Sequence, residues 1–197
     1  MKFDPQQYHR RSIRLQGYDY SQAGAYFVTI VAQGRACLFG EIVKDEIVLN
    51  PAGMMVQTAW QSLPKRFNNI EPVVCVIMPN RFHAIVIVNE PVGAGLVPAL
   101  ADRAHASGAS GATTRVAPTK PTLGQIIGAF KSITTHEYIQ GVNCLGWPAF
   151  DKRLWQRNYY EHIIRNSNEA DRIQNYVESN PVMWNNDEEN PGCERNH

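Results

Sequence analysis

The sequence predicts an α+β fold in which helices pack against a mainly antiparallel sheet. Segments rich in β-branched and aromatic residues, which favour strands, recur along the chain. Segments with apolar residues at helical spacing lie between and after them. The resulting order is strand, hairpin, helix, two strands, helix, strand and helix. That order is typical of helices packed on an antiparallel sheet.

The first half of the predicted domain contains a strand, a hairpin and a helix. Residues 26–31 (YFVTIV) form a buried strand, and 41–43 and 47–49 form a short hairpin. Asn50 is a typical helix N-cap, and Pro51 suits the first helical position. The helix that follows ends near Pro64, and its apolar residues have roughly helical spacing: Met54, Met55, Ala59, Trp60 and Leu63.

Two further strands are predicted at residues 73–78 and 83–88, joined by a turn at 79–81. Both runs are almost continuously apolar, which indicates central strands covered on both faces. Residues 91–121 are then dominated by Gly, Ala, Ser, Thr and Pro. We interpret them as a flexible insertion outside the core, because a compact domain rarely contains so long a structureless loop.

The last predicted elements are two helices with a strand between them. Thr122 opens the first helix, and residues 154–164 form the strand. A capping residue followed by an acidic side chain at 167–169 opens the second helix. Pro181 ends it, because the residue before a proline avoids the helical region.

These elements form one domain of residues 25–184, between an N-terminal arm of residues 1–24 and a tail of residues 185–197. The chain has 197 residues and a net charge of +1, so binding of nucleic acid requires a local basic patch. The arm is basic, and is either solvated or a phosphate-binding segment. The acidic run at 187–189 is expected to lie away from such a patch or to form a mobile tail.

The cysteines and the N-terminus favour a reducing, cytoplasmic location. Four scattered cysteines without CxxC spacing argue against a zinc ribbon or a disulfide framework: Cys37, Cys75, Cys144 and Cys193. No signal peptide is visible after Met1, and the longest apolar stretch is interrupted by residues 79–81. We therefore expect a cytoplasmic protein, associated with the nucleoid if it binds DNA.

Two pairs of residues have the spacing of a reactive site. Arg81 and His83 are two apart and share one face of a strand, although only His83 could bind a metal ion. Tyr176 and Asn180 are four apart and share one face of a helix. A tyrosine hydroxyl attacks phosphorus effectively when a cation polarises the phosphate. The alternatives are a structural histidine and a tyrosine that packs against the core.

Residues 154–165 (LWQRNYYEHIIR) alternate aromatic side chains with basic and amide ones. Such a segment can stack nucleobases and bind the phosphate backbone. Alternating aromatic residues on a strand are equally typical of a core. Both interpretations stay open at this point.

In combination, these segments resemble the REP-associated tyrosine transposases, which are relatives of the single-tyrosine HUH insertion-sequence transposases. The resemblance covers almost the whole chain except the insertion and the last residues. It rests on the segments RRSIRL (10–15), GYDY (17–20), YFVTI (26–30), MPN-x-FH (78–83), GAFKS (128–132), LWQRNYY (154–160) and YVESNP (176–181).

The resemblance implies a ferredoxin-like HUH fold and cleavage of single-stranded DNA at repetitive extragenic palindromes, which form hairpins. Tyr176 matches the nucleophile that forms a 5′-phosphotyrosine and leaves a 3′-OH for strand transfer. His83 and Asn180 match two ligands of a Mg²⁺ or Mn²⁺ ion. Tyr159 and Tyr160 match a strand motif and not the nucleophile.

One position departs from the family pattern, because Arg81 stands where the family has its first metal-binding histidine. Arginine has no lone pair to donate and stays protonated. Its charge about 4 Å from an ion costs roughly 4 kcal/mol per unit charge at an effective dielectric of about 20. Either the metal site is weakened or inactivated, or Arg81 contacts the scissile phosphate in place of the ion.

The sequence thus leaves three functions open. The first is a metal-dependent endonuclease and strand transferase acting on hairpin DNA, and the second is a hairpin-binding protein of the same family that cannot cut. The third is an RNA-binding ferredoxin-like domain. DNA binding is expected to weaken with salt, since five residues are candidate phosphate contacts: Arg10, Arg11, Arg14, Lys131 and Arg157.

Overall fold

The structure is a computed structural model that describes residues 19–20, 22–90, 121–187 and 189–192. Its main sheet has the strand order β4-β5-β1-β6, and every neighbouring pair is antiparallel. These strands are β1 (Gly24–Val31), β4 (Ile70–Met78), β5 (Arg81–Val88) and β6 (Tyr160–Ile164). A separate hairpin is formed by β2 (Gly40–Val43) and β3 (Glu46–Leu49). The predicted α+β class and ferredoxin-like order are confirmed.

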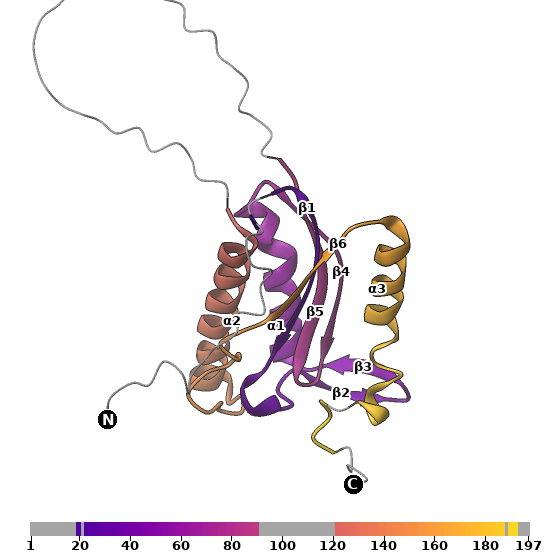
Figure 1. Cartoon of the computed structure of the whole chain (residues 1–197). Helices are drawn as coiled ribbons and strands as arrows, with labels where there is room; N and C mark the ends of the chain where they lie inside the picture. Colours follow the sequence, from indigo (N-terminus) through magenta and orange to yellow (C-terminus); the bar gives the residue numbers. More distant parts are fainter. Residues whose placement is uncertain (1–18, 21, 91–120, 188, 193–197) are drawn as a thin grey trace, which may run out of the picture.

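Helices cover both faces of the sheet (Figure 1). The helices α1 (Pro51–Ser62) and α2 (Leu123–Leu145) lie on one face, and α3 (Ser167–Ser179) lies on the other. The larger core packs α1 and α2 against residues such as Val28 and Phe82 of the central strands. A smaller core lies between the sheet and α3, around Phe27, Ile85 and Val177. Because successive side chains of a strand point to opposite faces of the sheet, the same strands contribute residues to both cores.

Local capping explains where the helices begin. Asn50 accepts a hydrogen bond from the backbone N–H of Gly53 at 2.9 Å, with Pro51 at the first helical position, as predicted. Thr122 and Gln125 form a capping box at the start of α2. Asn166 caps α3, one residue before the predicted start, and α3 ends directly before Asn180.

The β2–β3 hairpin is built around a tight two-residue turn. Lys44 and Asp45 both have positive φ, of 51° and 65°, as a type I′ turn requires. Three short 3-10 helices complete the described chain at Gln33–Arg35, Leu63–Lys65 and Trp184–Asn186, named η1, η2 and η3. No helix in the described ranges is long and apolar enough to cross a membrane.

Three sequence-based expectations need correction. Strand β4 is an edge strand and not a central one, and its Pro72 lies at a bulge, where a missing N–H is tolerated. The turn before β5 comprises only residues 79–80, so that Arg81 belongs to the strand. Of the predicted strand 154–164, only Tyr160–Ile164 is regular, while Trp155 forms an isolated bridge to Ala32.

Parts of the predicted organisation fall outside the described residues. These are residues 1–18 of the arm, 91–120 of the insertion, and 193–197 of the tail. Within the described chain, Cys37, Cys75 and Cys144 are free thiols. Burial raises the pKa of the Cys75 thiol to about 11, so this sulfur stays protonated and unreactive.

Candidate functional site

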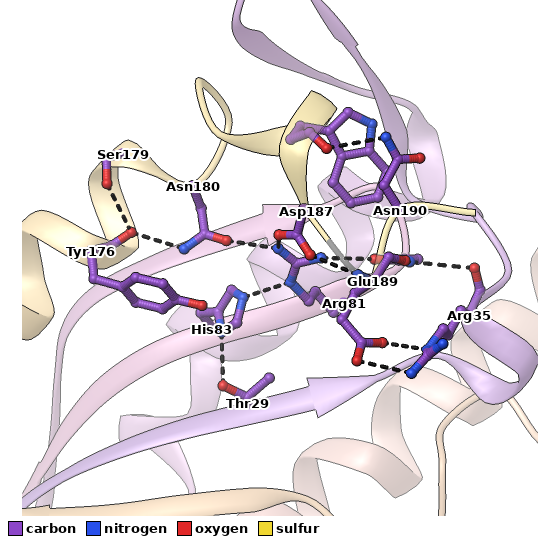
Figure 2. Close-up of polar contacts among 12 residues, drawn as sticks. Thr29, Arg35, Arg81, His83, Tyr176, Ser179, Asn180, Asp187, Glu189 and Asn190 are labelled. Carbon is purple, nitrogen blue, oxygen red and sulfur yellow. Dashed lines mark hydrogen bonds and ion pairs between the residues drawn. The ribbon is translucent and has the colours of Figure 1, made fainter. Parts of the chain in front are cut away.

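The predicted site residues meet on the face of the sheet that α3 covers (Figure 2). Arg81 and His83 are alternate residues of β5 and point to this face. His83 lies directly across from Thr29 of β1. The end of α3 brings Tyr176 and Asn180 to the same place. The structure thus assembles Arg81, His83, Tyr176 and Asn180 from segments about a hundred residues apart.

His83 is buried and hydrogen-bonded at both ring nitrogens. Arg81 donates from Nε to Nε2 of His83 at 2.7 Å, and Nδ1 of His83 lies 2.8 Å from the hydroxyl oxygen of Thr29. A guanidinium can only donate, so Nε2 must be the accepting nitrogen. The ring proton therefore resides on Nδ1 and is donated to Thr29. This arrangement requires a neutral histidine.

The electrostatics of the site agree with a neutral ring. Burial and, to a smaller extent, the nearby Arg81 charge lower the pKa of His83 to about 3, while the Asn180 side chain acts in the opposite direction. A histidine usually titrates near 6.5. His83 therefore carries no charge at neutral pH.

Arg81 is a buried cation whose donors are directed inward. Besides His83, its guanidinium donates from Nη2 to Oδ1 of Asn180 at 2.8 Å and from Nη1 to Oδ1 of Asn80 at 3.4 Å. Its Nη2 also forms an ion pair with the carboxylate of Asp187. The ring of Trp184 lies 5.4 Å from Cζ, which favours the cation further. Only 2% of the Arg81 side chain is exposed, so the guanidinium is not presented to a ligand.

Asn180 and Tyr176 are connected through the end of α3. The amide nitrogen of Asn180 donates to the carbonyl oxygen of Tyr176 at 2.8 Å, which turns the amide oxygen toward Arg81. The Tyr176 ring lies edge-on to the rings of His83 and Phe27, with centroid separations of 5.7 and 6.0 Å. Half of Tyr176 is exposed, so it lies at the surface of the site and Asn180 lies beneath it.

The residues present do not fit a divalent metal ion. The two atoms that would bind it, Nε2 of His83 and Oδ1 of Asn180, both accept hydrogen bonds from Arg81. The other ring nitrogen of His83 carries its proton. Among the described residues, no group of three His, Cys, Asp or Glu side chains could hold a metal. A positive guanidinium therefore lies between the expected ligands, where it also repels a cation.

The C-terminal segment contributes two acidic residues that the sequence did not place here. Asp187 pairs with Arg81, and Glu189 pairs with Arg35, the last residue of η1 (Figure 2). The amide of Asn80 also donates to the backbone carbonyl of Glu189. Asp187 and Glu189 are therefore held by ion pairs and do not form the mobile tail that was one of the two expectations, because buried Arg81 requires a counter-charge. No local pattern could reveal contacts across more than 100 residues.

The five residues predicted to contact DNA phosphates differ in their surroundings. Lys131 of α2 donates to the carbonyl oxygens of Gln156, Arg157 and Asn158, at 2.9, 3.4 and 3.3 Å. Its ammonium group is thus bound to the protein and holds the loop before β6. Arg157 itself is exposed. Arg10, Arg11 and Arg14 lie outside the described residues.

The aromatic residues of 154–165 divide between the core and the surface. Trp155 is buried and donates from Nε1 to the hydroxyl of Thr134 at 2.8 Å, so it belongs to the core. Tyr159 packs against that core, with the Lys131 ammonium 5.4 Å from its ring. Tyr160, by contrast, is 47% exposed and lies on the α3 face beside Phe27.

Comparisons with known proteins agree with this architecture. No family model matches the chain. An uncharacterised protein of Haemophilus influenzae is 34% identical over 190 residues, which is 95% of this chain and 96% of that protein. The solved structure of a REP-associated tyrosine transposase bound to a REP hairpin has a TM-score of 0.54 at 18% identity, covering 86% of this chain and 73% of the other. That likeness shows that the two chains share a fold.

A second solved structure is that of a candidate transposase from Deinococcus radiodurans. It has a TM-score of 0.44 at 14% identity and covers 84% of this chain and 95% of the other.

Proposed function

We propose that this chain, which belongs to the same protein family as the uncharacterised Haemophilus influenzae protein, is a REP-associated transposase homologue that binds hairpin DNA without cutting it. Two observations support an action on DNA. The described fold is shared with a transposase that was solved on a REP hairpin. The sequence segments that resemble this family include His83, Tyr176 and Asn180 of the candidate site.

The position of the Arg81 guanidinium supports the second part of the proposal, that the protein does not cut the DNA. Cleavage requires the Tyr176 oxygen to form a bond to phosphorus while the bond from phosphorus to the 3′ oxygen breaks and that oxygen takes up a proton. The phosphate must be polarised for this attack. In this chain the expected ligands are hydrogen-bonded to Arg81. These residues are therefore not free to hold a metal ion that would polarise the phosphate.

Arg81 is also poorly suited to polarise the phosphate itself. Its guanidinium donates to Asn80, His83 and Asn180 and is neutralised by Asp187. Direct phosphate binding would require several of these contacts to break in a buried site, where an unpaired charge is costly. Of the two interpretations of Arg81, an inactivated metal site is thus the better supported.

The test is a measurement of affinity with and without metal. Fluorescence anisotropy would use a labelled single-stranded palindrome from the genome that encodes the protein, in excess EDTA and then in Mn²⁺. A non-cleaving binder is expected to bind equally in both, and to bind the palindrome more tightly than a scrambled strand. An affinity that depends on Mn²⁺ would contradict the proposal. Tighter binding of an RNA hairpin of the same sequence would favour an RNA-binding domain instead.

A further inference from the structure

We propose that Tyr160 and Tyr176 form a stacking surface for unpaired nucleobases of the bound DNA, with Arg172 as the adjoining phosphate contact. The inference rests on the proposed function and specifies which part of the DNA this surface contacts. In this proposal Tyr176 binds the DNA and does not act as a nucleophile. The geometry that supports it lies on the exposed side of the layer between α3 and the sheet.

Both tyrosines are anchored at one edge and open at the other. The ring of Phe27 lies edge-on to each, with centroid separations of 6.2 Å to Tyr160 and 6.0 Å to Tyr176. Phe27 is 7% exposed and belongs to the smaller core, and its ring also stacks on that of His83 at a centroid separation of 5.8 Å. The tyrosines nevertheless remain 47% and 50% exposed. Rings held in place by packing but open to solvent can stack a base at a small entropic cost.

Charged and polar residues of the same two elements lie next to the tyrosines. Arg172 precedes Tyr176 by four residues on α3, which places it one turn away on the same face. Its side chain is 78% exposed and 3.8 Å from Glu169. His162 follows Tyr160 by two residues on β6 and therefore points to the same face. Aromatic rings flanked by a cation are the arrangement by which proteins bind single-stranded DNA.

The acidic side chains that contact this surface are already engaged. Glu169 accepts hydrogen bonds from Nε2 of His162 and from the backbone N–H of Arg165, both at 2.8 Å. Asp187 is paired with Arg81. The residues beneath the tyrosines, Phe27 and His83, are uncharged. An anionic strand therefore meets the exposed Arg172 cation, while Glu169 and Asp187 are engaged by neighbouring groups, which argues for nucleic acid as the occupant in preference to an apolar partner.

Substitutions of the rings test the inference through DNA affinity. Tyr160→Leu and Tyr176→Leu are each expected to weaken binding of a palindrome with a single-stranded flank by roughly 5- to 150-fold, because base stacking on an aromatic ring has about that effect. Tyr160→Phe and Tyr176→Phe retain the ring and are expected to bind normally. Ile139→Ala is the matched control, since Ile139 is 40% exposed on α2 across the sheet.

Two direct readouts separate stacking from a loss of folding. A 5-iodouracil placed in the single-stranded flank is expected to cross-link to Tyr160 or Tyr176 on irradiation, with the site identified by mass spectrometry. Arg172→Gln is expected to lower the slope of log affinity against log salt by about one.

The outcomes are distinguishable. Normal affinity of both leucine variants, together with a cross-link elsewhere, would overturn the stacking surface while leaving DNA binding intact. Failure of the unaltered protein to bind any DNA would overturn the proposed function and the stacking surface together.

Discussion

Nε of Arg81 lies 2.7 Å from Nε2 of His83, and this hydrogen bond determines the tautomer of the histidine, while burial and the Arg81 charge keep the ring neutral. Because a guanidinium only donates, the histidine must be neutral with its proton on Nδ1. The lone pair that would bind a metal ion is thereby occupied by a positively charged side chain of the same strand. The mismatch between this site and a metal ion follows largely from this pair of residues.

Removing the guanidinium is expected to raise the pKa of His83. In the unaltered protein burial and the Arg81 charge hold it at about 3, far below 6.5. Between these values the unfolded chain binds a proton that the folded chain does not, so the free energy of unfolding falls as pH falls from about 6.5 to about 3. Arg81→Gln should shift the His83 titration upward in an NMR pH series. An unchanged titration would show that the Arg81 charge has no influence.

The two acidic residues of the C-terminal segment are expected to differ in their effect on stability. Asp187→Ala leaves buried Arg81 without its counter-charge and should lower the free energy of unfolding by about 3–5 kcal/mol. Glu189→Ala breaks a pair in which Arg35 is 42% exposed and should cost about 1 kcal/mol or less. Urea unfolding would measure both. Equal effects would mean that the Arg81–Asp187 pair has no special role.

Arg81→His is expected to create a metal site from residues already in place. The substitution removes the cation, frees Nε2 of His83 and Oδ1 of Asn180, and adds an imidazole two residues from His83. Mn²⁺ at about 100 times its dissociation constant should then stabilise the variant by about 2.7 kcal/mol, which raises its Tm by several degrees. Arg81→Gln, which adds no ligand of that kind, is the control. An equal rise in the unaltered protein would contradict the assignment.

Because of Lys131, the free energy of unfolding is expected to depend on pH in the alkaline range. Burial lowers its pKa to about 8 from 10.5. Between these values the unfolded chain holds a proton that the folded chain has lost, so the free energy of unfolding rises with pH from about 8 to about 10.5. Lys131→Met should remove this rise. Lys152→Met, at a side chain 85% exposed, should leave it unchanged. Urea unfolding at pH 7.5 and 10 would distinguish them.

The sequence predicted those parts of the fold that depend on local chemistry. Asn50 followed by Pro51, and Thr122 with Gln125, determine helix starts through contacts within a few residues. Apolar continuity, by contrast, did not distinguish the edge strand β4 from the central β5. The segment 154–159 has strand-like residues, yet Lys131 binds three of its carbonyl oxygens in place of a neighbouring strand.

The site was predictable only in part for the same reason. The spacings of Arg81 with His83 and of Tyr176 with Asn180 indicated shared faces, and the structure brings both pairs together. The contacts of Arg81 with Asp187, and of Glu189 with Arg35, join residues over 100 positions apart. The spacing of residues along the chain does not indicate such a pairing. The ion pair that neutralises Arg81 is therefore evident only from the three-dimensional structure.

The most direct test of the central claim is a search for a covalent protein–DNA adduct. The unaltered protein would be incubated with labelled single-stranded palindrome DNA and Mn²⁺ and resolved on a denaturing gel, beside Arg81→His and the double variant Arg81→His/Tyr176→Phe. We expect no adduct from the unaltered protein although it binds the DNA, and we expect any adduct from Arg81→His to disappear in the double variant. An adduct from the unaltered protein that Tyr176→Phe abolishes would show a working nuclease and would contradict the account.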